Sequence, residues 1–208
     1  MHLNSEIESY INANIIPLYA AFDPAHQIDH VTTVIANSME YLKYFTVNPN
    51  MVYVVGAFHD LGLSVNRKEH HIHSGKILLA NDFLPKHFSK AEITLMQKAV
   101  EDHRASNKHR PRNDYGLIVA EADRDISYQT ILRRTALFTL GNNPQLSYKE
   151  HFSHVYDHIR EKYGEGGYLK LWLDFGPNKH RLEQLRTKIN SDDFTSDIEK
   201  TLKTEGDF

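Results

Sequence analysis

The stretch MVYVVGAFHD, residues 51–60, is a short apolar segment that ends in a histidine followed by an aspartate. Asn48 and Pro49 precede it, and they form the pair of an N-cap residue and a first-turn proline that is typical of a helix start. The segment therefore predicts a short apolar helix, and His59 and Asp60 are expected at its end.

The segments on both sides of this stretch also predict helices. Apolar residues recur three or four positions apart, as in residues 5–21, and pairs such as Asp23-Pro24 and Ser89/Glu92 are helix-start signals. We find no alternation long enough for a strand, no internal repeat and no low-complexity linker. The sequence therefore predicts an all-α fold. The expected helices span about 5–21, 24–42, 49–60, 71–83, 89–103, 115–141, 147–162, 168–190 and 193–204.

Composition limits the possible functions. The 208 residues are 40% hydrophobic, which is enough for one substantial core, and this length favours one domain. There is no cysteine, so disulfides and thiolate metal sites are excluded, whereas 14 histidines is a high count. The net charge of −3 gives no general attraction for nucleic acid. With no signal-peptide pattern and no apolar run long enough to span a bilayer, we expect a cytoplasmic protein.

Further metal-type residues lie along the chain at wide intervals. They are His30, the cluster His70, His71 and His73, then His103 and Asp123. Imidazole and carboxylate together suit iron, manganese, zinc and similar divalent ions, and a carboxylate can bridge two such ions. Since the residues fall on different expected helices, one central site fed by several helices is geometrically reasonable.

The adjacent pair sets a local condition on this site. His59 and Asp60 point about 100° apart if both lie in a regular helix, so they reach one ion only from a helix end or a distorted last turn. Gly62 follows closely and supplies that freedom.

In this order and spacing, the residues resemble the HD-domain metal-dependent phosphohydrolases, whose pattern runs H…HD…D with two more histidines in two-metal members. His30 with the apolar residues after it, the doublet His59-Asp60, and Asp123 in an Ala-Asp context carry the resemblance, which covers about residues 23–125. It implies a single HD-type helical bundle over residues 1–208, with a core of about 23–140 and C-terminal helices at 145–204.

The resemblance also implies one or two divalent ions, of Fe, Mn, Mg, Co, Ni or Zn. His30, His59, Asp60 and Asp123 would bind one ion, and His71 and His103 would bind a second that shares Asp60. His71 is chosen because family members often have a histidine four residues before a glycine, here Gly75. His70 and His73 are then supporting or substrate-contacting residues, or merely solvated.

A basic loop follows His103, and we expect it to bind substrate. Arginine side chains match phosphate oxygens in a bidentate way, and lysine adds a point charge. The alternative is a solvated polar loop with no role. The substrate-binding candidates are Arg104, Lys108, Arg110 and Arg112, together with His70.

The predicted function is hydrolysis of a phosphate ester or anhydride in a nucleotide or another small metabolite, through a metal-bound hydroxide with Asp60 and His59 as catalytic residues. The sequence contains no Gly-x-Ser-x-Gly motif and no Walker-type glycine loop. Covalent acyl catalysis and P-loop chemistry therefore have no support. The leaving-group acid stays open among Glu101, Asp102 and the spare histidines. A di-iron oxygenase on the same scaffold and a non-enzymatic metal-bound regulatory domain are the alternatives. We expect a small phosphorylated substrate as partner, no specific nucleic acid, no membrane, and a possible homodimer through the C-terminal helices.

Overall fold

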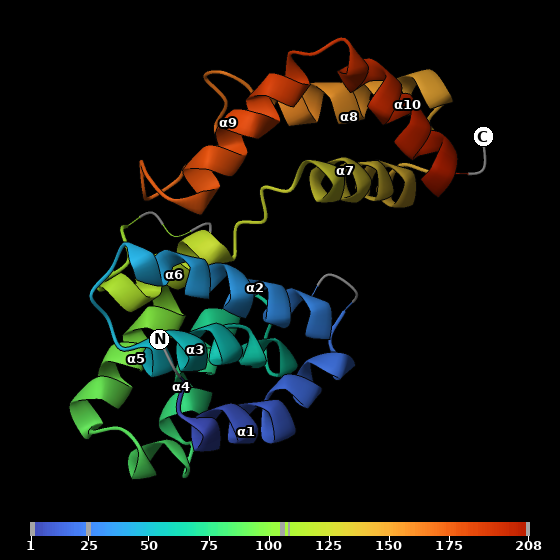
Figure 1. Ribbon diagram of the computed structural model, residues 1–208. Coiled ribbons are helices and arrows are strands. Elements are labelled where there is room, and N and C mark those ends of the chain that lie inside the picture. The colour runs from blue at the N-terminus through green and yellow to red at the C-terminus, as the bar shows by residue number, and fades with distance from the viewer. Residues whose placement is uncertain (1–2, 24–25, 105–106, 108, 207–208) are drawn as a thin grey trace. The chain divides into compact units, whose positions relative to one another are not determined.

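The computed structural model describes residues 3–23, 26–104, 107 and 109–206, and this part of the chain contains helices and no strand (Figure 1). The predicted all-α fold is confirmed. The chain divides into two compact units, Met1–Arg124 and Asp125–Phe208. No helix among the described residues is long and apolar enough to cross a membrane.

The N-terminal unit contains six α-helices and four short 3₁₀ helices in its described residues. In chain order they are α1 (Ser5–Asn14), η1 (Ile16–Ala21), α2 (Ile28–Glu40), η2 (Tyr41–Lys43), α3 (Pro49–Phe58), η3 (Leu61–Ser64), α4 (His70–Leu79), η4 (Leu84–Lys86), α5 (Lys90–Asp102) and α6 (Asp114–Ala122).

Helix α3 is the centre of the N-terminal unit. It contacts α1, α2, α4, α5 and α6, and every residue from Met51 to Phe58 is buried. Because helices pack against α3 on all sides, its sequence is apolar all round instead of along one stripe. The Asn48 side chain accepts a hydrogen bond from the Asn50 N–H at 3.0 Å, so the predicted helix start is confirmed. The packing places the residues that follow α3 inside the protein.

Helix α5 delivers a second candidate residue to the same interior. Its start is the predicted capping box, because the Ser89 and Glu92 side chains each accept a hydrogen bond from the other residue's backbone N–H. Its apolar face packs into the core that surrounds α3, and His103 follows as the C-cap residue. The side chain of His103 is therefore buried.

The C-terminal unit contains α7 (Tyr128–Asn142), α8 (Tyr148–Tyr163), α9 (Pro177–Ile189) and α10 (Asp193–Glu205) in its described residues. Helix α7 contacts α8 and α10, and these helices share a hydrophobic core that runs from Ile126 to Leu202. The first core ends at Ala122. The boundary thus lies near residue 124, and α7 belongs to the C-terminal helices, whereas the sequence prediction extended the first core to about residue 140.

Several predicted helices are shorter or divided in the structure, and the two largest differences are corrections. The expected helix 115–141 is broken between α6 and α7, where the Asp125 carboxylate accepts a hydrogen bond from the Ser127 N–H at 2.9 Å and turns the chain. The expected helix 168–190 begins only at Pro177. The preceding Gly176 has a φ of 86°, a left-handed conformation that favours glycine and ends regular helix geometry.

Candidate metal centre

The doublet His59-Asp60 lies in a distorted turn at the end of α3, as its adjacency requires. His59 keeps helical dihedral angles, but Asp60 has φ −111° and ψ 5°, and η3 begins at the next residue. The chain here lies directly against α4. A Cβ on Gly62 would stand 2.0 Å from the His70 carbonyl oxygen and 2.6 Å from the Ser74 nitrogen. Only glycine allows this approach, which brings the start of α4 to the doublet.

One group of ligand-type atoms lies on the Oδ2 side of Asp60. The Nε2 atoms of His30 and His59 are 3.1 Å apart, and they lie 3.4 and 3.3 Å from Asp60 Oδ2. Asp123 Oδ1 is 3.4 Å from His30 Nε2 and 3.9 Å from His59 Nε2. The structure thus brings together the four residues that the sequence assigned to the first ion.

A second group lies on the Oδ1 side of the same carboxylate. The Nε2 atoms of His70 and His103 are each 3.3 Å from Asp60 Oδ1 and 3.2 Å from each other. The rings of His59 and His103 pack edge to face with centroids 5.1 Å apart, so the two groups adjoin. The Asp60 carboxylate therefore stands between two histidine pairs.

Backbone carbonyls fix the orientation of three of these rings. The Nδ1 atoms of His59, His70 and His103 lie 2.8, 2.9 and 2.6 Å from the carbonyl oxygens of Gly56, Arg67 and Val100. A carbonyl accepts hydrogen bonds only, so each Nδ1 donates, and in the neutral ring, the form that binds metal, each Nε2 presents a lone pair to the site. Metal-binding histidines typically donate their other ring N–H to a carbonyl or carboxylate in this way.

The distances between these acceptors fit shared cations. Nitrogen and oxygen ligands that bind one ion at about 2.0–2.2 Å lie roughly 3.0–3.6 Å from one another in tetrahedral or octahedral sites. The separations within each group, apart from the 3.9 Å pair, fall in this range. Without a cation or an added proton, lone pairs would face lone pairs in a buried site. The donor set therefore suits one or two divalent ions.

Charge and burial act in opposite directions on Asp60. Burial alone would raise the pKa of this carboxyl group, but a protonated His59 and hydrogen bonds from His103 and His30 hold it well below its usual range. For His59, burial lowers the ring pKa, but the charge of Asp60, the hydrogen bond to Asp60 and the charge of Asp123 together raise it above its usual value. The carboxylate is thus charged and only 4% exposed, and it requires compensating positive charge at close range.

Two residues that sequence reasoning missed hold the doublet in place. The fully buried Tyr19 hydroxyl donates to the Ala57 carbonyl at 2.9 Å and accepts the Asp60 N–H at 3.3 Å. The Ser74 hydroxyl accepts the Gly62 N–H at 2.8 Å. Because Tyr19 falls in an ordinary apolar stripe and Ser74 follows the histidine cluster, neither carries a local sequence signal for this role.

The assignment of His71 as the middle ligand is corrected, because the structure places His70 in the second group. Gly75 faces α5, where its Cβ would stand 2.9 Å from Glu101 Cγ. A residue four positions before Gly75 shares that face, so His71 turns toward α5 and away from Asp60. His71 Nδ1 is buried without a hydrogen-bond partner, and the ring packs against His70 with centroids 5.6 Å apart. His70, which was expected to contact substrate, lies in the cluster beside Asp60 and His103.

The basic residues of the loop after His103 have different roles. Arg112 is a structural anchor: its Nε lies 2.9 Å from Asp102 Oδ2, and its guanidinium also donates to Glu101 at 2.7 Å. These bonds raise the Arg112 pKa, and they occupy nitrogen atoms of the side chain that was expected to bind phosphate. Arg104 donates to the Lys68 carbonyl at 3.1 Å, and its charge helps lower the pKa of His70.

The remaining loop candidates border an open cavity of about 570 Å³. Arg110 and His109 line it together with His71, Glu101 and Arg112. The predicted substrate-binding residue Lys108 lies outside the described residues. The cavity therefore lies between the loop and the side of α4 that carries His71.

Comparisons with known proteins give one match. Neither the curated proteins nor the solved structures contain a significant match to this chain. The family described as HD domain matches residues 28–126, a range that includes His30, the doublet, both histidines of the second group and Asp123. The predicted resemblance is confirmed: residues 28–126 match the HD-domain family, and the histidine and aspartate cluster fits an HD-type metal site.

Proposed function

We propose that this protein is a metal-dependent phosphohydrolase that acts on a phosphate ester or anhydride of a nucleotide or another small metabolite. The proposal is carried by one observation, the Asp60 carboxylate that faces a histidine pair with each of its oxygens. HD domains are commonly hydrolases, which supports the same reaction class. Divalent ions held here would lower the pKa of water toward neutrality and polarise a phosphoryl oxygen.

The residues of the chain have separate tasks in this reaction. Asp60, with His59 and His30, would hold one ion together with Asp123, and His70 and His103 would hold the other. The backbone carbonyls behind the rings keep the lone pairs directed inward. Because Asp60 and His59 are buried, bulk water is kept from most of the site.

Substrate would approach from the cavity of about 570 Å³ beside His71. Arg104 lies close enough to His70 and His71 to lower the pKa of both rings, so its charge also reaches a phosphate at the second histidine pair. Arg110 lines the cavity further out. Glu101 is bound to Arg112, so Asn107, His109 and Arg110 are the polar lining residues that substrate would meet there.

The experiment loads the protein separately with Mn²⁺, Fe²⁺, Co²⁺ or Ni²⁺ and offers nucleotides, dinucleoside polyphosphates and small phosphate esters. We expect released phosphate or a shortened nucleotide with at least one metal. The Asp60→Asn variant keeps the shape of the side chain but removes its charge, so it should lose metal and activity together while its helical circular dichroism persists.

Other outcomes separate the alternative functions. Substrate-dependent oxygen uptake by the iron-loaded protein, without phosphate release, would identify an oxygenase. A protein that binds metal and changes none of these substrates would be a regulatory domain. An Asp60→Asn variant with full metal content would remove the basis of the proposal.

A further inference from the structure

A second candidate site lies in the C-terminal unit, between α7 and α8. A pocket of about 330 Å³ opens there, at the lower end of the sizes usual for small-molecule sites. Ile131 and Tyr163 are almost fully buried and form its base, whereas Phe138 is 66% exposed and stands at its edge. The site thus offers apolar contact to a small ligand. Its lining residues all belong to the C-terminal unit and none to the HD-domain cluster.

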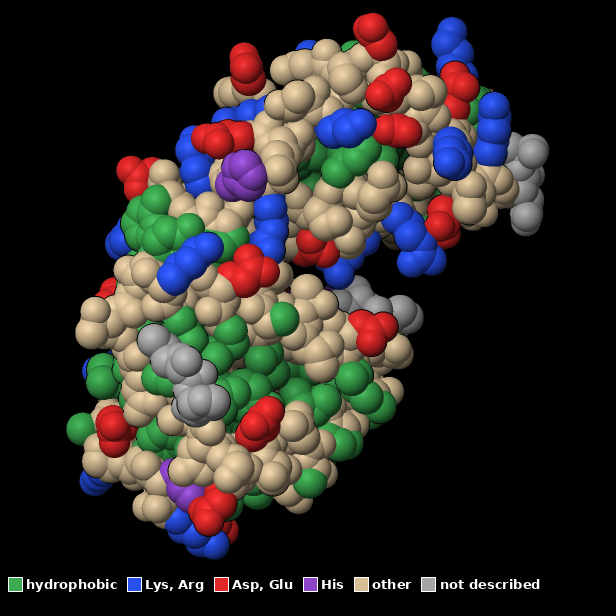
Figure 2. Space-filling model, in the orientation of Figure 1, with side chains coloured by type: hydrophobic (Ala, Val, Ile, Leu, Met, Phe, Trp, Pro, Cys, Tyr) green, Lys and Arg blue, Asp and Glu red, His purple; other side chains and the backbone are tan. Residues whose placement is uncertain are grey.

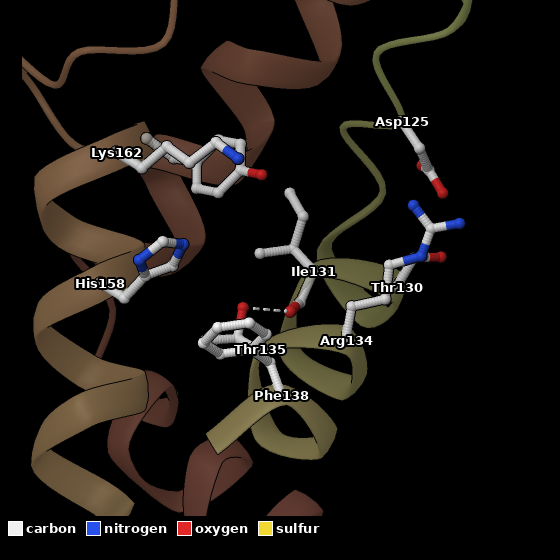
Figure 3. A pocket seen from close by; sticks show the side chains of 9 residues that line it. Asp125, Thr130, Ile131, Arg134, Thr135, Phe138, His158 and Lys162 are labelled. Atoms are coloured by element: carbon white, nitrogen blue, oxygen red, sulfur yellow. Dashed lines mark hydrogen bonds between the residues drawn. The ribbon is translucent and has the colours of Figure 1, made fainter. Parts of the chain in front are cut away.

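The charges around this pocket are mostly positive. Arg134 of α7 and Lys162 of α8 both line it, and Asp125 is its one carboxylate. Figure 3 shows Lys162 and His158 on the α8 side, Arg134 near Asp125 on the other side, and Ile131 between them. The Asp125 carboxylate accepts the Ser127 N–H, which commits part of it to the turn before α7.

Among the described residues, no carboxylate oxygen lies within 4.0 Å of a side-chain nitrogen of Arg134 or Lys162, so neither forms an ion pair. Lys162 Nζ instead lies 5.0 Å from the centre of the Tyr163 ring. On the displayed face of the C-terminal unit, basic and acidic side chains are interspersed (Figure 2). The neighbouring Arg133 follows that pattern, with its Nε 2.7 Å from Glu205 Oε1. Arg134 and Lys162 thus both line the cavity without an ion-pair partner in the described part of the chain.

The neutral polar groups of the pocket can add hydrogen bonds. Burial, and then the charge of Lys162, lowers the pKa of His158, so the ring is neutral near pH 7 and can donate or accept. Burial, and then Asp125, raises the pKa of Tyr163 to about 12, so its phenol stays a hydrogen-bond donor. A ligand with acceptor oxygens would meet these groups as well as the two cations.

We propose that the C-terminal unit binds a small organic anion with a planar apolar group in this pocket. Arg134 and Lys162 bind the anionic group, a phosphate or a carboxylate, and Phe138 and Ile131 contact the planar group. Charge attraction and apolar contact act together, so a ligand that lacks either part binds more weakly. This site is independent of the hydrolytic function proposed for the HD domain.

The test uses the full chain carrying Asp60→Asn, so that no probe binds through ions at the metal centre. Phenylphosphonate, benzoate, methylphosphonate and benzyl alcohol are titrated separately while the methyl NMR signals of Ile131 and Thr135 are followed. We expect saturable shifts with phenylphosphonate or benzoate, and at least roughly ten-fold weaker binding of the probes that lack the ring or the charge. Arg134→Gln should weaken binding of the preferred anion about ten-fold, and Arg133→Gln should leave it unchanged.

Several results would overturn the proposal. Absence of saturation by both aromatic anions at millimolar concentration would exclude this ligand class. Equal weakening by Arg133→Gln and Arg134→Gln would show general attraction to a basic surface. If methylphosphonate binds as tightly as phenylphosphonate, the planar contact is absent, and if benzyl alcohol does so, the anion site is absent. Preference between phenylphosphonate and benzoate distinguishes a phosphate ligand from a carboxylate ligand.

Discussion

The Tyr19 hydroxyl allows a direct test of how the fold holds the metal centre. Tyr19→Phe removes one oxygen atom from a fully buried position and leaves the ring in place. The Ala57 carbonyl then loses its hydrogen-bond donor in the last turn of α3, where carbonyls lack helical partners, and the Asp60 N–H loses its acceptor. An unsatisfied buried polar group costs about 1–3 kcal/mol. We therefore expect the free energy of unfolding to fall by about that amount.

The same substitution should weaken metal binding, because the Asp60 backbone is no longer fixed. Loss of a supporting hydrogen bond behind a metal ligand typically lowers affinity 10- to 100-fold, so we expect a decrease of roughly ten-fold. Denaturant unfolding of the metal-free protein gives the first quantity, and competition with a chelator gives the second. The matched control is Tyr53→Phe on α3, whose hydroxyl donates to Asn12 Oδ1 at 3.3 Å and makes no hydrogen bond to the doublet.

The control should lose about 1 kcal/mol or less and retain its metal affinity. If Tyr19→Phe binds metal as tightly as the parent and unfolds at the same denaturant concentration, the hydroxyl does not anchor the doublet. If Tyr53→Phe loses equal affinity, the effect comes from general loosening of α3.

Three further predictions test the geometry around the doublet. His70→Ala should halve the metal stoichiometry of a two-ion protein, whereas His71→Ala should retain both ions; the reverse result, by elemental analysis, would restore His71 as the ligand. Gly62→Ala forces backbone atoms of α4 apart and should cost about 1–3 kcal/mol in denaturant unfolding, whereas Gly141→Ala, whose Cβ meets no atom within 4 Å, should be neutral or stabilising by up to about 1 kcal/mol. Arg112→Ala should lower stability by roughly 1.5–3 kcal/mol because Asp102 is buried, and unchanged stability with reduced substrate affinity would instead indicate a phosphate-binding role.

The centre of the fold could be predicted from the sequence because its signals are local. An apolar run with Asn48 and Pro49 before it specifies a buried helix with a defined start, and the Ser89 capping box does the same for α5. The first ligand group could also be predicted, since His30, the doublet and Asp123 follow an ordered pattern.

Helix ends in the C-terminal half were harder to predict because helical periodicity continues across turns. Residues 115–141 contain apolar residues throughout, yet the Asp125 side chain captures the Ser127 N–H and ends the regular backbone pattern. Gly176-Pro177 is a local signal of a helix start that was available in the sequence. A side chain that accepts a backbone N–H thus replaces a helical hydrogen bond, and a short Asp-x-Ser segment suffices to divide a helix whose apolar periodicity continues.

The choice between His70 and His71 shows which information a linear pattern lacks. The two residues differ by about 100° around α4, so the ligand is decided by the rotation of that helix. Gly75 turns one face of α4 toward α5, and Gly62 admits the first turn of α4 against η3. These two contacts point His70 at Asp60 and leave His71 beside Glu101. The spacing to Gly75 shows which residues share a face of α4. Only the packing of α4 against α5 and η3 shows which residues that face contacts. A mutation at Gly62 should therefore affect the second histidine pair more than the first, whose ligands come from α2, the end of α3 and the end of α6.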